Sequence, residues 1–228
     1  MQIFRAKDRG AMNIDWLQAR YYFSFAYWMD PSRLGVGPIR VVNNDMIAPA
    51  GGFPPHSHRE MEIITIPLRG AVRHEDSGDG RGVVGAGEVQ IMSAGAGVTH
   101  SEFNASGTEE LELFQIWIET AVAGGPPRYG QASYEVPEGE WATLTGPVDS
   151  SAPTTIQQQA TIKRGKFTDA ITPKTEASSA NMLIIVSGTA TVNGDEVRKR
   201  DSIEWYGSEI IEIVPEGEVD LLWISAQS

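Results

Sequence analysis

Short runs rich in β-branched and aromatic residues recur from end to end of this chain, separated by glycine, proline or aspartate. Long amphipathic patterns with the helical period are hard to find. The clearest runs cover residues 61–66, 88–92, 111–118, 181–186 and 219–224. Short strands punctuated by turn residues are typical of β-sandwiches and β-barrels. The sequence therefore predicts an all-β protein.

The chain divides into two parts at the glycine- and proline-rich residues 123–127. The strand, glycine, strand and turn pattern of residues 61–92 returns in degenerate form in the C-terminal third, as in an internal repeat. We therefore expect an N-terminal domain over residues 1–125 and a C-terminal domain over residues 126–228, with 126–153 as connecting structure. The second domain contains no histidine, so we expect it to lack metal ligands and to serve as a structural or interaction unit.

Composition excludes several classes of function. Among 228 residues, 18 Lys and Arg face 30 Asp and Glu, a net charge of −12 that repels nucleic-acid phosphates. Cysteine is absent, which excludes thiolate metal sites and cysteine nucleophiles. The N-terminus has no apolar signal core, and no apolar run approaches the ~20 residues of a membrane span. We expect a cytoplasmic protein with no direct contact to nucleic acid or membrane.

Three of the four histidines lie in two short segments and are spaced for metal binding. Alternate side chains of a strand share a face, so His56 and His58 can present two imidazoles to one ion. His100 and Glu102 repeat this spacing and add a third nitrogen and a carboxylate. A single His-x-His pair also occurs by chance on surfaces, but two such pairs in a histidine-poor chain favour a metal site. Nitrogen and oxygen ligands without sulfur suit Fe(II), Mn, Ni, Cu or Zn.

Two other polar segments have simpler interpretations. His74 stands near the start of an expected hairpin, where a turn or surface histidine is expected. The strand over 40–47 is interrupted by Asn43-Asn44-Asp45, a turn-prone sequence. The histidine pair itself follows Pro54-Pro55, so we expect these histidines to begin a strand that continues to residue 66.

At this point the motifs resemble a known family. The pattern His56-x-His58-x-x-x-Glu62 is similar to the first cupin motif, and Gly95-x-Gly97-x-x-His100-x-x-x-Asn104 to the second. The likeness to the pirin family is more specific. It is carried by the segments 23–26, 30–31, 52–58, 74–76, 90–102 and 115–118.

The resemblance implies two tandem jelly-roll barrels, a bicupin, with a metal in the first barrel. It implies His56, His58, His100 and Glu102 as the ligands. In cupins generally the carboxylate ligand would be Glu62. Following the pirin pattern, we expect Glu62 to lie behind the ligands, where it could orient a histidine.

The resemblance also implies an activity, the quercetin 2,3-dioxygenase reaction of bacterial relatives. We expect one divalent transition metal, with Fe(II) first among the candidates, a flavonol-like substrate, dioxygen, and Glu102 as general base. A metal-binding, redox-responsive regulator that acts through a protein partner is the alternative, and a cupin with a substrate other than a flavonoid is a third hypothesis. The aromatic or soft residues nearest the ligands in sequence, each expected to serve core packing first, are Phe23, Phe25, Phe53, Met92 and Phe114.

Overall fold

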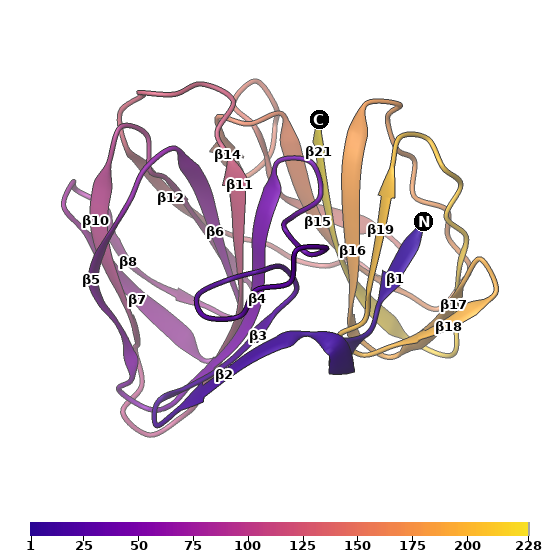
Figure 1. Ribbon diagram of the computed structural model, residues 1–228, viewed down its shortest axis with the longest axis horizontal. Helices are drawn as coiled ribbons and strands as arrows, with labels where there is room; N and C mark the ends of the chain where they lie inside the picture. Colours follow the sequence, from indigo (N-terminus) through magenta and orange to yellow (C-terminus); the bar gives the residue numbers. More distant parts are fainter. Residues whose placement is uncertain (228) are drawn as a thin grey trace.

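The computed structural model describes residues 1–227 and consists of two β-barrels side by side (Figure 1). Each barrel pairs one seven-stranded sheet with a smaller sheet. Helix is confined, within the described residues, to the 3-10 turn η1 (Ala6–Asp8), so none of them forms a helix that could cross a membrane. The prediction of an all-β, two-barrel fold is confirmed.

The N-terminal barrel is built from eleven strands. Its large sheet has the order β12-β9-β6-β11-β4-β3-β2. Those strands are β2 (Gly10–Ile14), β3 (Leu17–Tyr21), β4 (Ile39–Ile47), β6 (Met61–Arg69), β9 (Glu88–Ser93), β11 (Leu111–Glu119) and β12 (Arg128–Ser133). Its small sheet, in the order β5-β10-β7-β8, has β5 (Gly52–His58), β7 (Ala71–Asp76), β8 (Arg81–Gly85) and β10 (Val98–Asn104).

The C-terminal barrel repeats this plan with ten strands. Its large sheet has the order β1-β19-β16-β21-β15-β13-β14. Those strands are β1 (Gln2–Phe4), β13 (Trp141–Pro147), β14 (Thr154–Ile156), β15 (Ala160–Phe167), β16 (Ser179–Ser187), β19 (Ser202–Tyr206) and β21 (Val219–Gln227). Its small sheet, in the order β18-β17-β20, has β17 (Thr189–Val192), β18 (Asp195–Arg198) and β20 (Ile213–Pro215).

The two large sheets pack against each other and share one hydrophobic core. On β11, Leu111 and Leu113 point into the N-terminal barrel, whereas Phe114 and Ile116 join the core between the barrels. Residues Met182 and Ile184 of β16 enter this shared core from the other barrel. A strand with both faces covered needs apolar residues at nearly every position. This explains the nearly continuous apolar run at 111–118, which was predicted to be a strand covered on both faces.

Two strands cross the division expected near residue 125. The N-terminal β1 pairs with β19 of the C-terminal barrel, and β12 pairs with β9 of the N-terminal barrel. Figure 1 shows β1 in the right-hand barrel beside β19, whereas β2 lies in the left-hand barrel below β3. The division at 125 remains a prediction. The expectation that 126–153 is connecting structure was wrong, because this stretch supplies β12 and β13.

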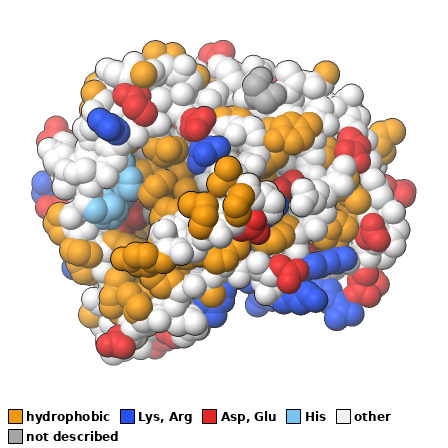
Figure 2. Space-filling model, viewed as in Figure 1, with side chains coloured by type: hydrophobic (Ala, Val, Ile, Leu, Met, Phe, Trp, Pro, Cys, Tyr) orange, Lys and Arg blue, Asp and Glu red, His pale blue; other side chains and the backbone are white. Residues whose placement is uncertain are grey.

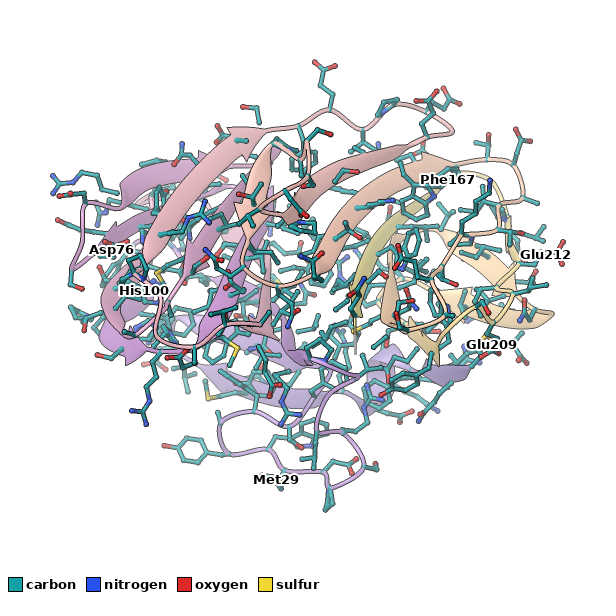
Figure 3. The ribbon with its side chains drawn as sticks, turned by 90° about the horizontal axis from the view of Figure 1, so that it is seen from above. Met29, Asp76, His100, Phe167, Glu209 and Glu212 are labelled. Atoms are coloured by element: carbon teal, nitrogen blue, oxygen red, sulfur yellow. The ribbon has the colours of Figure 1, made fainter. Side chains whose placement is uncertain are left out.

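Aromatic side chains fill the interior of the C-terminal barrel. Trp141 contacts Phe167 and Trp223 with ring centroids 4.9 and 5.5 Å apart, and Trp205 stacks on Trp223 at 6.5 Å. Figure 3 places Phe167 at this end of the molecule and His100 at the other. This dense packing is consistent with a structural role for the second barrel.

Candidate metal centre and adjoining cavity

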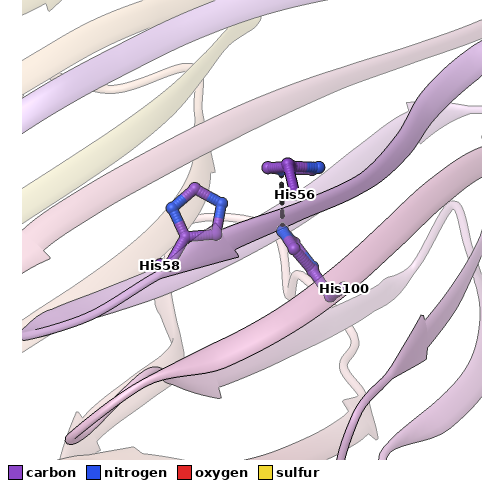
Figure 4. A group of neighbouring side chains, drawn as sticks. All are labelled: His56, His58 and His100. Atoms are coloured by element: carbon purple, nitrogen blue, oxygen red, sulfur yellow. Dashed lines mark hydrogen bonds between the residues drawn. The ribbon is translucent and has the colours of Figure 1, made fainter.

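The three predicted histidine ligands meet on the small sheet of the N-terminal barrel. In the pairing of β5 with β10, His56 lies directly opposite His100, and His58 lies opposite Val98. The ring centroids of the three imidazoles are 4.4 to 4.9 Å apart (Figure 4). One ring nitrogen from each, all within 4.8 Å of one another, could therefore contact one ion.

The histidine pair ends strand β5, which corrects the expectation that it begins a strand. Strand β5 includes Pro54 and Pro55, and a turn at Glu60 with φ of +53° separates it from β6. Because β5 is an edge strand that pairs only with β10, prolines lacking a backbone N–H are tolerated there. The histidines are thus held by a separate sheet from the one that carries β6.

Hydrogen bonds to Nδ1 fix the orientation of two imidazoles. The His56 Nδ1 atom lies 2.8 Å from the Pro54 carbonyl oxygen, which can only accept, so Nδ1 carries the proton. The His100 Nδ1 atom lies 3.3 Å from His74 Nδ1. The Nε2 atoms of His56 and His100 face each other at 3.0 Å, and the buried His58 Nε2 has no hydrogen-bond partner among the described residues. Three converging imidazole nitrogens fit a metal ion, since backbone and side-chain partners behind the ligands are a usual feature of such sites.

Burial keeps these imidazoles in the form that binds metal. Desolvation, with a smaller contribution from the neighbouring His56, lowers the pKa of His58 to about 4 against the opposing effect of Glu102. Desolvation likewise lowers the pKa of His100 to about 4, against the raising effect of Glu102 and with the help of the other histidines. Both rings are therefore neutral at pH 7, and a neutral imidazole is the metal ligand.

His74 is buried beside the site, and its expected place at a turn or surface was wrong. It lies on β7, directly opposite Glu102, and only 1% of its surface is exposed. Its Nε2 atom is 3.2 Å from an Asp76 carboxylate oxygen, and its ring stacks on Tyr129 at 4.9 Å. Figure 3 shows Asp76 close to His100. Strand alternation explains the burial, because Val72 points inward two residues earlier.

This position allows His74 to set the tautomer of His100. When neutral His74 donates its Nε2 proton to Asp76, its Nδ1 atom becomes an acceptor. His100 then donates from Nδ1 and keeps its Nε2 lone pair for an ion. Desolvation lowers the pKa of His74, but Glu102 and Asp76 together raise it above its ordinary value.

The Glu102 carboxylate is buried and contacted by Gln90, Gln115 and Thr65, none of which was among the predicted site residues. Gln90 Nε2 donates to Oε1 at 3.0 Å and Gln115 Nε2 donates to Oε2 at 2.7 Å. Thr65 Oγ1 lies 3.2 Å from Oε1 and donates its single proton to Gln115 Oε1 at the shorter distance of 2.6 Å. Burial works to raise the pKa of Glu102, but its interactions with His74, His100 and Gln90 outweigh burial and lower it to about 2. Glu102 groups with His74 and His100 within 4.8 Å, in a second cluster beside the three converging imidazoles.

Glu62 is buried as well, but it does not orient a histidine in the described structure. Its Oε2 atom accepts a hydrogen bond from Ser93 Oγ at 2.5 Å, and no hydrogen bond to an imidazole is found within residues 1–227. Ser93 lies opposite Glu62 in the pairing of β6 with β9. The expected role of Glu62 behind the ligands is therefore replaced by a contact within the large sheet.

A cavity of about 270 Å³ opens beside the histidines and continues into the barrel. His56 and Glu102 line it on the metal side, and apolar side chains make most of its wall. Figure 2 shows histidine and hydrophobic side chains side by side on this face. The wall residues include Met12, Leu17, Ala19, Phe25, Phe53 and Trp117.

Only part of the expected aromatic set lines this cavity. Phe25 and Phe53 do so, whereas Phe23 and Phe114 are buried in the core between the barrels. Met92 packs with Ile63, Ala94 and Val98 in a separate cluster. Trp117 was missed because its strand was interpreted only as core. It contacts His58 with ring centroids 4.7 Å apart.

The far wall of the cavity carries polar side chains from β3 and β4. The expected interruption of the 40–47 strand was wrong, because β4 runs unbroken from Ile39 to Ile47. Asn43 and Asp45 face the cavity, and Asn44 points the other way and donates to the Leu113 carbonyl oxygen at 3.3 Å. Burial, followed by the charge of Glu102, raises the pKa of Asp45 to about 7.

Comparison with known proteins supports this description. The Pirin family model matches residues 4–118, and a quercetinase C-terminal cupin domain model matches residues 143–225. The quercetin 2,3-dioxygenase of Escherichia coli K12 is 35% identical over 96% of this chain and 95% of its own length. A putative quercetin 2,3-dioxygenase of Pseudomonas aeruginosa is 40% identical over 87% of this chain and 88% of its own. The crystal structure of a bacterial pirin from Escherichia coli in complex with nickel(II) superposes with a TM-score of 0.92 at 33% identity, covering 99% of both chains.

Proposed function

This chain belongs to the pirin family and is a metal-dependent dioxygenase of the pirin type, and we propose that its substrates are flavonols such as quercetin. The observation that carries the proposal is the convergence of three imidazole nitrogens at the mouth of a cavity with mostly apolar walls. Such a cavity suits a flat aromatic ligand, and ligand sites commonly combine apolar walls with a few placed polar groups.

We propose that His56, His58, His100 and Glu102 hold one divalent transition metal, with Fe(II) first among the candidates and Mn, Ni, Cu and Zn compatible with the same donors. When bound, the metal supplies Lewis-acid chemistry and a site for exogenous ligands. The unpartnered, buried His58 Nε2 supports this assignment, because a polar atom hidden from water costs free energy unless something pairs with it. A carboxylate ligand must be ionised, and the low pKa of Glu102 meets that requirement.

The protein's own side chains would position the substrate and accept its proton. Phe25 and Phe53 would hold the flat rings and exclude water from the reacting end. Glu102 is our candidate proton acceptor, because its carboxylate lines the cavity next to His56. Its hydrogen bonds to Gln90 and Gln115 would hold it in place during the reaction.

The test is turnover by protein that has been stripped with a chelator and reloaded with Fe(II), Mn(II), Ni(II), Cu(II) or Zn(II). Aerobic incubation with quercetin should consume the flavonol and release one carbon monoxide per flavonol lost. His58→Ala should abolish the activity with every metal, whereas Tyr22→Phe, outside the cavity, should retain it.

Absence of turnover with all five metals would exclude flavonol cleavage. Metal bound at one equivalent without turnover would favour the regulator hypothesis, in which a protein partner senses the state of the metal. Turnover of another aromatic substrate, with quercetin inert, would favour the third hypothesis. The cytoplasmic location stays a prediction that fractionation of cells would check.

A further inference from the structure

Three polar atoms on the far wall of the cavity have no hydrogen-bond partner among residues 1–227. They are Tyr21 Oη, Asn43 Oδ1 and Asp45 Oδ1, and each side chain is at most 4% exposed. In the pairing of β3 with β4, Tyr21 lies directly opposite Asn43, and Asp45 lies opposite Ala19. Since alternate residues of a strand share a face, all three point into the barrel, and the small Ala19 leaves space in front of Asp45.

These three atoms contrast with the polar groups around Glu102, while His58 Nε2 and Trp117 Nε1, which lie beside each other at the histidines, are also unpartnered among residues 1–227. Around Glu102, both the donor and the acceptor of the Gln115 side chain are used, and Gln90 donates to the carboxylate as well. Buried polar atoms are nearly always paired, and each unpaired one costs free energy of folding. Three of them on one cavity wall indicate that a ligand, and not the protein, pairs with them.

The chemistry of the three groups selects the ligand. Asn43 Oδ1 accepts, Tyr21 Oη both donates and accepts, and Asp45 accepts when ionised or donates when protonated. Phenolic hydroxyls both donate and accept, and two of them on one aromatic ring could contact neighbouring strands together. Leu17, Ala19 and Phe25 provide the apolar surface for the ring that carries them.

Resting on the flavonol function proposed above, we propose that Tyr21, Asn43 and Asp45 form a hydroxyl-binding subsite. It holds ring hydroxyls of a polyhydroxylated aromatic ligand while the other end of that ligand lies at the histidines. The subsite makes the enzyme selective for polyhydroxylated over singly hydroxylated flavonols, because only the former satisfy all three polar atoms.

Anaerobic binding to the metal-loaded protein tests the subsite without turnover. The probes are quercetin, with five hydroxyls, and 3-hydroxyflavone, with one. Wild type should bind quercetin at least about tenfold more tightly, a ratio that corresponds to one or two net hydrogen bonds. Tyr21→Phe and Asp45→Leu should each reduce the ratio of quercetin affinity to 3-hydroxyflavone affinity about fivefold to tenfold. The affinity for 3-hydroxyflavone itself should stay within about twofold of wild type. Asp45→Asn retains an acceptor, so it should preserve most of the ratio.

Tyr22→Phe is the matched control, since Tyr22 Oη donates to the Arg200 carbonyl oxygen at 2.9 Å, away from the cavity. It removes a satisfied hydroxyl, so it should lower the melting temperature and leave both affinities unchanged. Tyr21→Phe should behave in the opposite way, with an unchanged or higher melting temperature and weaker quercetin binding. A loss of folding in Asp45→Leu would therefore not prevent a decision.

A wild-type affinity ratio in Tyr21→Phe would overturn the subsite even if quercetin is oxidised, and an unchanged ratio in Asp45→Leu, where that variant folds, would do the same. Selective binding that depends on Tyr21, without aerobic turnover by any metal form, would overturn the flavonol reaction and keep the subsite. Equal affinity of wild type for the two probes would also overturn the subsite.

Discussion

The Nε2 atoms of His56 and His100 face each other across strands β5 and β10 at 3.0 Å. The Nδ1 proton of His56 is used by the Pro54 carbonyl oxygen, so in the neutral ring Nε2 has only a lone pair. Two lone pairs at this distance repel each other unless a proton or a metal ion lies between them. The pair is therefore arranged for a shared cation.

Removal of one converging imidazole should remove the metal. We expect His56→Ala, His58→Ala and His100→Ala each to lower metal affinity by more than ~100-fold, a larger effect than the loss of a partner behind a ligand. Metal content after dialysis against a weak chelator, measured by elemental analysis, checks this. Full occupancy in folded His56→Ala and His100→Ala variants would place the site elsewhere.

His74 should influence metal affinity without being required for binding. Its contact with His100 fixes the ring that presents Nε2, and such partners typically account for 10- to 100-fold in affinity. We expect His74→Ala to weaken binding by roughly this factor while one equivalent still binds at saturating metal. Titration with a competing chelator measures the effect. An affinity equal to wild type would show that the neighbouring strand alone orients His100.

A buried ion pair between the two barrels should contribute more to stability than an ion pair at the surface. Arg33 makes two contacts of 2.6 and 2.8 Å with Glu204, and both side chains are at most 8% exposed. Removing one partner leaves a buried charge, so Arg33→Met should cost roughly 3–5 kcal/mol of unfolding free energy. Urea denaturation with Arg69→Ala as control checks this, because Arg69 pairs with Glu110 at the surface and should contribute at most about 1 kcal/mol.

Strand parity and spacing predicted much of the fold and brought together the histidines of the candidate site. The apolar run at 111–118 indicated a strand covered on both faces, and two-residue spacing placed His56 and His58 on the same face of the small sheet as His100. Both inferences depend only on the period of a strand. The same period also predicts a buried His74, because His74 lies two residues after the apolar Val72 on one strand. The nearby turn led instead to the expectation of a turn or surface position.

Long-range pairing could not be predicted in the same way. Nothing in residues 2–4 indicates that β1 joins a strand about 200 residues later. The sequence Asn43-Asn44-Asp45 resembles a turn because these residues favour turns when exposed. In the structure they lie within β4, where Asn44 bonds across the sheet and the other two face a cavity that local sequence cannot reveal.

Asp45 should make the stability of the metal-free protein depend on pH. Its pKa is raised from 3.8 to about 7, chiefly by burial, so between these values the folded protein keeps a proton that the unfolded chain has released. Stability contributed by this group is therefore complete below pH ~4 and is lost as the pH rises to ~7. The Asp45→Asn variant has no ionisable side chain at this position, so the stability of this variant relative to wild type should increase over this pH range by up to ~4 kcal/mol. The size follows because each unit of difference between the folded and unfolded pKa corresponds to about 1.4 kcal/mol. Urea denaturation of chelator-treated wild type and variant from pH 4.5 to 8 measures the difference, and a difference that stays constant with pH would mean that Asp45 is ionised throughout.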